Sequence, residues 1–186
     1  MKELLTAPCY ILKITDDAAG ATESTLGGVP YWPEGMDYPA DKLFLAQINM
    51  KDIPDNTDFP EEGMLQFFIG ISDTYGLFEE DFAVVFHKEI GTPAKVQPNP
   101  CEFTPIEKPG RILIGDGSKL LGYPCFTQYD PREYEEEKRK YDRLLLQLDS
   151  DEHICWGDIG IANFFINEQK LAEGDFSDVF YNWDCC

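Results

Sequence analysis

The chain has 186 residues, of which 43% are hydrophobic and 13% aromatic, and this is enough apolar material for one domain with its own core. Its 35 acidic and 15 basic residues give a formal charge of -20, which repels phosphate backbones and anionic lipid headgroups over a Debye length of about 10 Å. We therefore expect no nucleic acid and no membrane among its partners.

The acidic residues are concentrated in two stretches of the chain. Residues 52–87 contain nine acidic residues and no Lys or Arg, and residues 144–186 contain nine acidic residues and one lysine, Lys170. Such stretches could attract a basic protein, or they could be solvated loops that keep an aromatic-rich protein soluble. The sequence is compatible with both interpretations.

Neither a targeting signal nor a cysteine motif is visible. The apolar stretch before Pro8 is too short for a signal peptide, and no apolar run reaches the roughly 20 residues that span a bilayer, so we expect a cytoplasmic protein. The cysteines include no Cys-x-x-Cys pair, which predicts neither a disulfide framework nor a zinc site. We expect reduced thiols, mostly in the core. The six cysteines are Cys9, Cys101, Cys125, Cys155, Cys185 and Cys186.

Four apolar blocks occur twice in the same order. The first series is Gly28–Trp32, Phe44–Asn49, Gly63–Ile69 and Asp81–His87, and the second is Gly122–Phe126, Leu144–Asp149, Gly160–Ile166 and Asp175–Tyr181. The offsets between matched blocks are 94, 100, 97 and 94 residues, which is too regular for coincidence. We infer an internal duplication.

Each block is a short apolar or β-branched run bounded by Gly, Pro or Asp, which predicts β-strands joined by turns. A further short strand is expected at Arg111–Ile114. One segment, from about Pro131 to Arg143, predicts a surface helix, because Asp130 is a candidate N-cap and Glu133 stands at the third helical position. Two ion pairs at i,i+4 spacing would support it, namely Glu135 with Arg139 and Glu136 with Lys140.

These elements predict a mainly β fold, α+β with minor helix, in which two copies of a β-rich unit pack as one roll- or barrel-like domain over residues 1–186. Repeat 1 covers about residues 26–90, a proline-rich connector covers about 91–118, and repeat 2 covers about 119–184. Each copy alone would have few strands and exposed edges, so the two are more stable as one body.

The same motifs resemble the YwqG-like family, a bacterial domain of unknown function. The resemblance rests on Leu26–Pro33, Gly63–Ile69, Phe126–Arg132, Leu144–Asp151, Trp156–Ile166 and Asp175–Cys185. It implies a duplicated, mainly β fold. That family is in turn similar to a eukaryotic group that includes programmed cell death protein 2, whose members act as dedicated chaperones for a basic ribosomal protein. The resemblance therefore implies protein binding, and it supplies no catalytic residues.

Polar amides stand at matched positions in otherwise apolar strands. A buried amide without a partner costs about 1–3 kcal/mol, so each of them needs fixed partners. One hypothesis is that the amides line a polar cleft with two tryptophans, ready for an extended peptide; the other is that they bond to the backbone of the Gly-Pro-aromatic loops, with the tryptophans in the core. The candidate binding residues are Trp32, Gln47, Gln66, Gln147, Trp156, Asp158 and Asn163.

Three carboxylates are weak candidates for a metal site, and no cofactor is predicted. Asp149, Asp151 and Asp158 follow strand ends, where they could hold a hard cation that activates water, with His153 nearby. The alternative is that these residues make turns at strand ends. His87 is matched with Tyr181, and Cys125 with Tyr31, which suggests packing positions in both cases.

The sequence thus leads to three function hypotheses. The first is a non-enzymatic, chaperone-like protein-binding module for a basic client. The second is a divalent-metal-dependent hydrolase that uses the three carboxylates. The third is an immunity or antitoxin-like protein that binds a basic toxin.

Overall fold

A computed structural model describes residues 8–78, 80–96 and 103–186; Cys101 and part of the predicted connector lie outside the described residues. Short 3-10 turns, η1 (Met50–Asp52) and η2 (Glu136–Lys140), accompany the strands and helices. The strands and helices are β1 (Cys9–Thr15), β2 (Thr25–Leu26), β3 (Lys42–Asn49), β4 (Met64–Gly70), β5 (Phe82–His87), β6 (Gly110–Leu121), α1 (Pro131–Tyr134), β7 (Arg143–Asp149), β8 (Ile161–Ile166), α2 (Glu168–Glu173) and β9 (Val179–Asp184).

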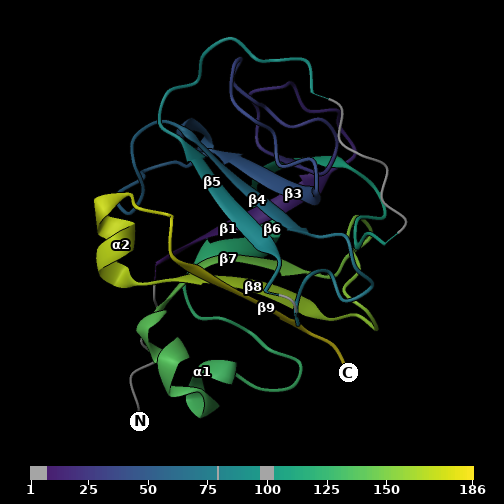
Figure 1. The fold of residues 1–186 in the computed structure, drawn as a ribbon, viewed down its shortest axis with the longest axis vertical. Helices are drawn as coiled ribbons and strands as arrows, with labels where there is room; N and C mark the ends of the chain where they lie inside the picture. Colours follow the sequence, from purple (N-terminus) through teal and green to yellow (C-terminus); the bar gives the residue numbers. More distant parts are fainter. Residues whose placement is uncertain (1–7, 79, 97–102) are drawn as a thin grey trace.

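All of these strands belong to one antiparallel sheet. Its order is β5-β4-β3-β2-β6-β7-β8-β9, and β1 pairs with β6. Figure 1 shows β3, β4 and β5 lying across β7, β8 and β9 at a steep angle, so the sheet curls around its own core. The predicted mainly β, duplicated, barrel-like fold is confirmed, and β5 and β9 are the two end strands of the sheet.

The strand registers show which residues of the two copies are equivalent. In copy 1, Gln66 of β4 lies opposite Gln47 of β3; in copy 2, Asn163 of β8 lies opposite Gln147 of β7. The register shifts around Leu45 in β3 and at the matching place in β7, so both copies have a β-bulge at the same point. Because a bulge position is a specific feature, its repetition supports the duplication independently of the sequence.

The duplication also includes β1 and β6. Thr25 of β2 pairs with Gln47 of β3, and Lys119 near the end of β6 pairs with the equivalent glutamine of β7. The end of β6 is therefore the counterpart of β2. On their other sides Thr25 pairs with Arg111 of β6, and Lys119 pairs with Ile11 of β1. The start of β6 is therefore the counterpart of β1, and each copy consists of five strand segments.

An approximate two-fold axis relates the copies. β1 pairs with the start of β6 symmetrically about Lys13 and Leu113, because Leu12 lies opposite Ile114 and Ile14 lies opposite Ile112. A rotation that moves Leu12 onto Ile112 therefore also moves Ile114 onto Ile14, as expected for a two-fold axis through this ladder. The copies are consequently joined by a continuous sheet and not by a linker between two separate bodies.

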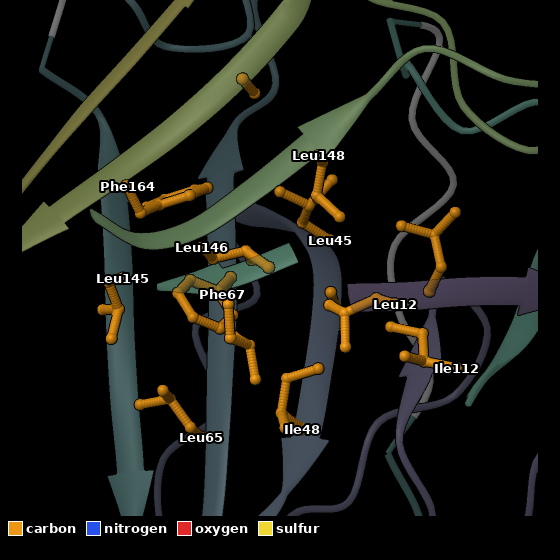
Figure 2. Close-up of a cluster of buried hydrophobic side chains, with 14 of the residues drawn as sticks. Leu12, Leu45, Ile48, Leu65, Phe67, Ile112, Leu145, Leu146, Leu148 and Phe164 are labelled. Carbon is orange, nitrogen blue, oxygen red and sulfur yellow. The ribbon is translucent and has the colours of Figure 1, made fainter. Parts of the chain in front are cut away.

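The core lies between the two copies. Phe67 of β4 and Phe164 of β8, which are equivalent residues, have ring centroids 4.9 Å apart, and both side chains are fully buried. Phe82 of β5 reaches across to Tyr181 of β9, with centroids 5.6 Å apart. Figure 2 shows Leu45, Phe67 and Phe164 among the leucines and isoleucines contributed by strands of both copies. Each copy therefore buries its apolar face against the other.

The predicted helix is shorter than expected. Asp130 caps α1 as predicted, since its carboxylate accepts a hydrogen bond from the backbone N–H of Arg132 at 3.0 Å. The helix ends at Tyr134 because Glu135 takes an extended conformation, and η2 follows. The longer helix over Pro131–Arg143 was therefore a wrong prediction.

The predicted i,i+4 ion pairs are wrong too. Lys138 pairs with Glu135, three residues earlier, at 2.8 Å, and Lys140 pairs with Asp178, in the turn before β9, at 2.8 Å. The cause is the interruption of the helix at Glu135, which changes the direction in which these side chains leave the backbone.

The last strand is displaced from its predicted position. The matched block Asp175–Tyr181 contains the start of β9 only, and β9 continues to Asp184. The preceding residues form α2, which sequence reasoning missed although Asn167 caps it and Gly174 ends it at φ 66°. The strand registers give β9 an offset of 97 residues from β5, so the counterpart of His87 is Asp184 and not Tyr181.

The prediction that the cysteines lie mostly in the core is wrong for the described ones. Cys9, Cys125 and Cys186 are exposed, and Cys155 and Cys185 are partly exposed. Cys125 differs in this respect from its counterpart Tyr31, which is fully buried. In the described ranges, no helix has the length and apolar character needed to cross a membrane.

We expect the shared core to produce coupled stability effects. Phe67→Ala and Phe164→Ala should each lower the free energy of unfolding by about 3–5 kcal/mol, because each leaves a cavity. The double variant should lose less than the sum, since the two rings contact each other. Urea unfolding followed by fluorescence and circular dichroism measures these values.

The matched control is Phe44→Ala combined with Phe164→Ala. Phe44 belongs to a separate cluster with Trp32 and Phe68, so its effect should add to that of Phe164 within about 0.5 kcal/mol. Additive effects for Phe67 and Phe164, or two separate unfolding transitions, would show that the copies have independent cores.

Candidate functional site

Two buried amides in copy 1 hold the backbone of one residue from both sides. Gln47 Oε1 accepts a hydrogen bond from the Tyr31 backbone N–H at 2.8 Å, and Gln66 Nε2 donates to the Tyr31 carbonyl oxygen at 2.6 Å. Gln66 Nε2 also donates to Gln47 Oε1 at 3.0 Å, which locks the two amides together. Gln47 Nε2 donates in turn to the carbonyl oxygens of Ala21 and Glu23.

Copy 2 likewise holds the backbone of one residue from both sides. Gln147 Oε1 accepts from the Cys125 backbone N–H at 2.8 Å, and Asn163 Nδ2 donates to the Cys125 carbonyl oxygen at 2.9 Å. We call each set an amide clamp: Gln47 and Gln66 on Tyr31, and Gln147 and Asn163 on Cys125. Both clamps hold a Gly-Pro-aromatic loop against the sheet, as the second sequence hypothesis expects.

The amide residues do not open onto a surface. Gln47, Gln66 and Asn163 are fully buried, and Gln147 is 1% exposed. Trp156 is fully buried in the main core, and Trp32 is 3% exposed in a cluster of its own. Asp158 is exposed in a turn near the end of β9. The structure thus does not bring the predicted binding residues together around a peptide-sized cleft.

The copies differ at the equivalent residues His87 of β5 and Asp184 of β9. His87 Nε2 lies 2.9 Å from Gln66 Oε1, and burial lowers the pKa of the His87 imidazole. Its counterpart Asp184 accepts hydrogen bonds from the backbone N–H groups of Thr127 and Gln128 at 3.1 Å and 2.8 Å. Both residues help to fix the loop or the clamp of their own copy, so this difference is structural.

Two of the three candidate metal ligands, Asp149 and Asp151, have other partners. Asp149 Oδ1 accepts from Gln147 Nε2 at 2.7 Å, and burial raises the pKa of the Asp149 carboxyl. Asp151 Oδ1 accepts from the backbone N–H groups of His153 and Ile154, as a turn-forming aspartate does. In the described part of the chain, no three His, Cys, Asp or Glu side chains form a group that could hold a metal ion.

A hollow that sequence reasoning missed lies beside β9. It has a volume of about 580 Å³ and is bordered by the loop before β5, by the segment around α1, and by the end of β9. Two aromatic residues on its rim are strongly exposed, Phe78 at 80% and Tyr129 at 55%. Trp183 forms part of its wall and donates from Nε1 to the Thr74 carbonyl oxygen at 2.8 Å, which ties the loop to β9.

This hollow continues into two neighbours. A second one, of about 280 Å³, shares Leu77, Lys138 and Asn182 with it, and a third, of about 320 Å³, shares Phe82 and Val179 with the second. Together they form a groove that follows residues 176–185, which include β9, and lies between this segment and β5 with its preceding loop. We call this the seam groove, because it lies between the two end strands of the sheet.

The charged side chains around the seam groove are mainly acidic. Lys138 and Lys140 are already paired with carboxylates in this structure. Asp73, Glu80 and Glu137 border the groove and are exposed, and among the described residues none of the three has an ion-pair partner. The seam groove therefore attracts cations more strongly than anions.

Comparison with protein families agrees with the two-copy architecture. A family model described as "Domain of unknown function (DUF1963)" matches residues 24–112 and again residues 111–185. The chain belongs to this family. The two matched segments meet at the start of β6, where the strand registers place the second copy. A search among curated proteins finds no match.

The seam groove escaped sequence reasoning because its walls come from separate parts of the chain. Asn182 and Trp183 share the groove with Lys138, 44 and 45 residues earlier in the chain, and with Leu77, 105 and 106 residues earlier. The acidic stretch 52–87 contains the loop that forms one wall of the groove. Its position next to β9 depends on the packing of the two copies.

The amide clamps should be essential for stability. Gln47→Leu should lower the free energy of unfolding by about 2–4 kcal/mol, because buried groups left without a partner cost about 1–3 kcal/mol each. Gln147→Leu should act in the same direction. Gln169→Leu, at an exposed position of α2, is the control and should change stability by less than about 0.5 kcal/mol. Chemical unfolding measures these free energies. Equal losses of stability for Gln47→Leu and Gln169→Leu would contradict the clamp interpretation.

His87 should make stability depend on pH in the range where its imidazole titrates. Because burial lowers its pKa in the folded state, the unfolded chain takes up the proton first as the pH falls below about 6.5. Stability should thus decrease from pH 7.5 to 5.5, and more steeply in the wild type than in His87→Gln, which keeps a donor for Gln66. Thermal unfolding across this range measures the difference, and parallel curves for the two proteins would contradict it.

Proposed function

We propose that this protein is a non-enzymatic binding module that takes up a basic segment of another protein in the seam groove. The observation that carries the proposal is a groove whose rim combines exposed aromatic rings with carboxylates that have no ion-pair partner among the described residues, in a chain of formal charge -20. Lysine and arginine side chains are suited to such a rim, because they bind carboxylates and also pack on aromatic faces.

The protein's own Lys138 shows how an ammonium group fits there. Its Nζ lies 4.6 Å from the centroid of the Phe180 ring and 2.8 Å from the Glu135 carboxylate. A partner's cation would find similar combinations farther along the groove, where Phe78 and Tyr129 stand near Asp73. This local geometry supports a cationic client more directly than net charge does.

The resemblance to the YwqG-like family, and through it to programmed cell death protein 2, supports the same class of function. Members of that eukaryotic group accompany a basic ribosomal protein, which is a client of the proposed kind. An immunity or antitoxin-like role would use the same groove with a basic toxin as the client. Both are forms of one activity, the capture of a basic protein segment.

A defined peptide tests the proposal. We expect an eight-residue peptide of alternating Lys and Val to bind in fluorescence anisotropy, and the same peptide with Glu in place of Lys not to bind. The affinity should fall as salt increases, because exposed charges are screened. The double variant Asp73→Lys, Glu80→Lys should weaken binding by about tenfold or more, since two attractive interactions become repulsive.

The control is a second double variant with the same change in net charge. Asp37→Lys with Glu61→Lys alters two exposed acidic residues that do not border the seam groove, and it should retain most of the affinity. If both double variants weaken binding equally, the attraction is due to total charge and the groove is not the site. If neither peptide binds, the proposed function fails.

A further inference from the structure

We infer that the client segment binds as an added β-strand along the free edge of β9. This rests on the proposed function and states its mode of binding. β9 is an end strand, so β8 is its partner on one side and the sheet supplies none on the other. Among the described residues, no hydrogen bond from outside the sheet reaches the backbone of Val179–Asp184. The backbone N–H and C=O groups of β9 that point away from β8 therefore have no hydrogen-bond partner in the described part of the chain.

The side-chain pattern shows that the edge of β9, and not one of its faces, borders the groove. Successive side chains of a strand point to opposite faces of the sheet. Yet four consecutive residues, Val179 to Asn182, border one part of the seam groove, and Asn182 to Cys185 border the next. A hollow that touches every residue in turn must lie alongside the backbone.

The strand also lacks two of the features that usually prevent strand addition. Proteins protect such edges with Pro, with Lys on the strand, or by covering them. β9 has the sequence Val-Phe-Tyr-Asn-Trp-Asp and contains neither Pro nor Lys. Its length of six residues corresponds to about 20 Å, which accommodates a strand of ordinary length.

A strand at this edge would also come close to β5. Phe82, Ala83 and Val84 of β5 are consecutive residues that border the groove opposite residues 176–179. The added strand would thus lie in the opening between the two ends of the sheet. Affinity would come from backbone hydrogen bonds to β9, and selectivity would come from the acidic and aromatic rim.

The occupant is a basic segment of a different protein and not a second copy of this chain. Two copies would bring together two bodies of formal charge -20, which repel each other. A segment carrying Lys or Arg would instead meet Asp73, Glu80 and Glu137, which have no ion-pair partner among the described residues. Charge complementarity thus selects the partner.

Amide hydrogen exchange of the full chain, followed by NMR with and without the Lys-Val octapeptide, tests the mode of binding. We expect alternate residues within Val179–Asp184 to exchange roughly tenfold more slowly in the complex, because every second amide of a strand points to the added neighbour. Amides of the interior strand β7 should not change. N-methylation of the peptide at one alternate set of residues should abolish binding, and at the other set it should not.

The outcomes separate this inference from the proposed function. If the octapeptide binds and exchange in β9 is unchanged, or if both N-methylated peptides bind as well as the parent, strand addition is overturned while the proposed function stands. If the octapeptide does not bind, both are overturned. If sedimentation shows a dimer whose β9 amides are protected without peptide, the edge is occupied by a second copy and the inference of a basic partner is overturned.

Discussion

The burial of one core between two related copies is the constraint on which the rest of this structure depends. Phe67 and Phe164 are equivalent residues and contact each other at the centre of the molecule, so neither copy can cover its apolar face alone. The ladder between β1 and β6 imposes the matching constraint on the backbone, because it is symmetric about Lys13 and Leu113. Together these contacts fix the angle at which the two sets of strands cross.

The crossing has a consequence at the far ends of the sheet. β5 and β9 approach each other through Phe82 and Tyr181, but their edges stay apart, and the seam groove lies between them. The packing that stabilises the two copies therefore leaves the outer edge of the six-residue strand β9 without a neighbouring strand in the described part of the chain. The amide clamps keep their loops fixed by satisfying buried hydrogen-bonding groups, and none of the clamp residues borders the seam groove.

The two copies differ in the residues of their end strands and in the helical segments that, within the described ranges, only copy 2 contains. The clamp glutamines Gln47 and Gln147 are identical in the two copies. By contrast, the equivalent residues of the end strands β5 and β9 are His87 in one copy and Asp184 in the other. Both satisfy local hydrogen bonds, by different chemistry. Copy 2 additionally has α1, η2 and α2 around β9, and α1 and η2 border the seam groove. The groove is thus a property of the pair and does not occur once per copy.

The sequence by itself determined the duplication, the mainly β fold and the matching of the buried amides between the copies, because these follow from apolar blocks and polar positions that repeat at nearly constant spacing. It also identified the cap at Asp130, which depends on neighbouring residues alone. It misplaced β9 and overextended the helix after Pro131, since both depend on contacts with distant residues. Only the tertiary structure decided that Leu77, Lys138 and Asn182 share one groove, because a surface made from three separate segments exists only after the two copies have packed.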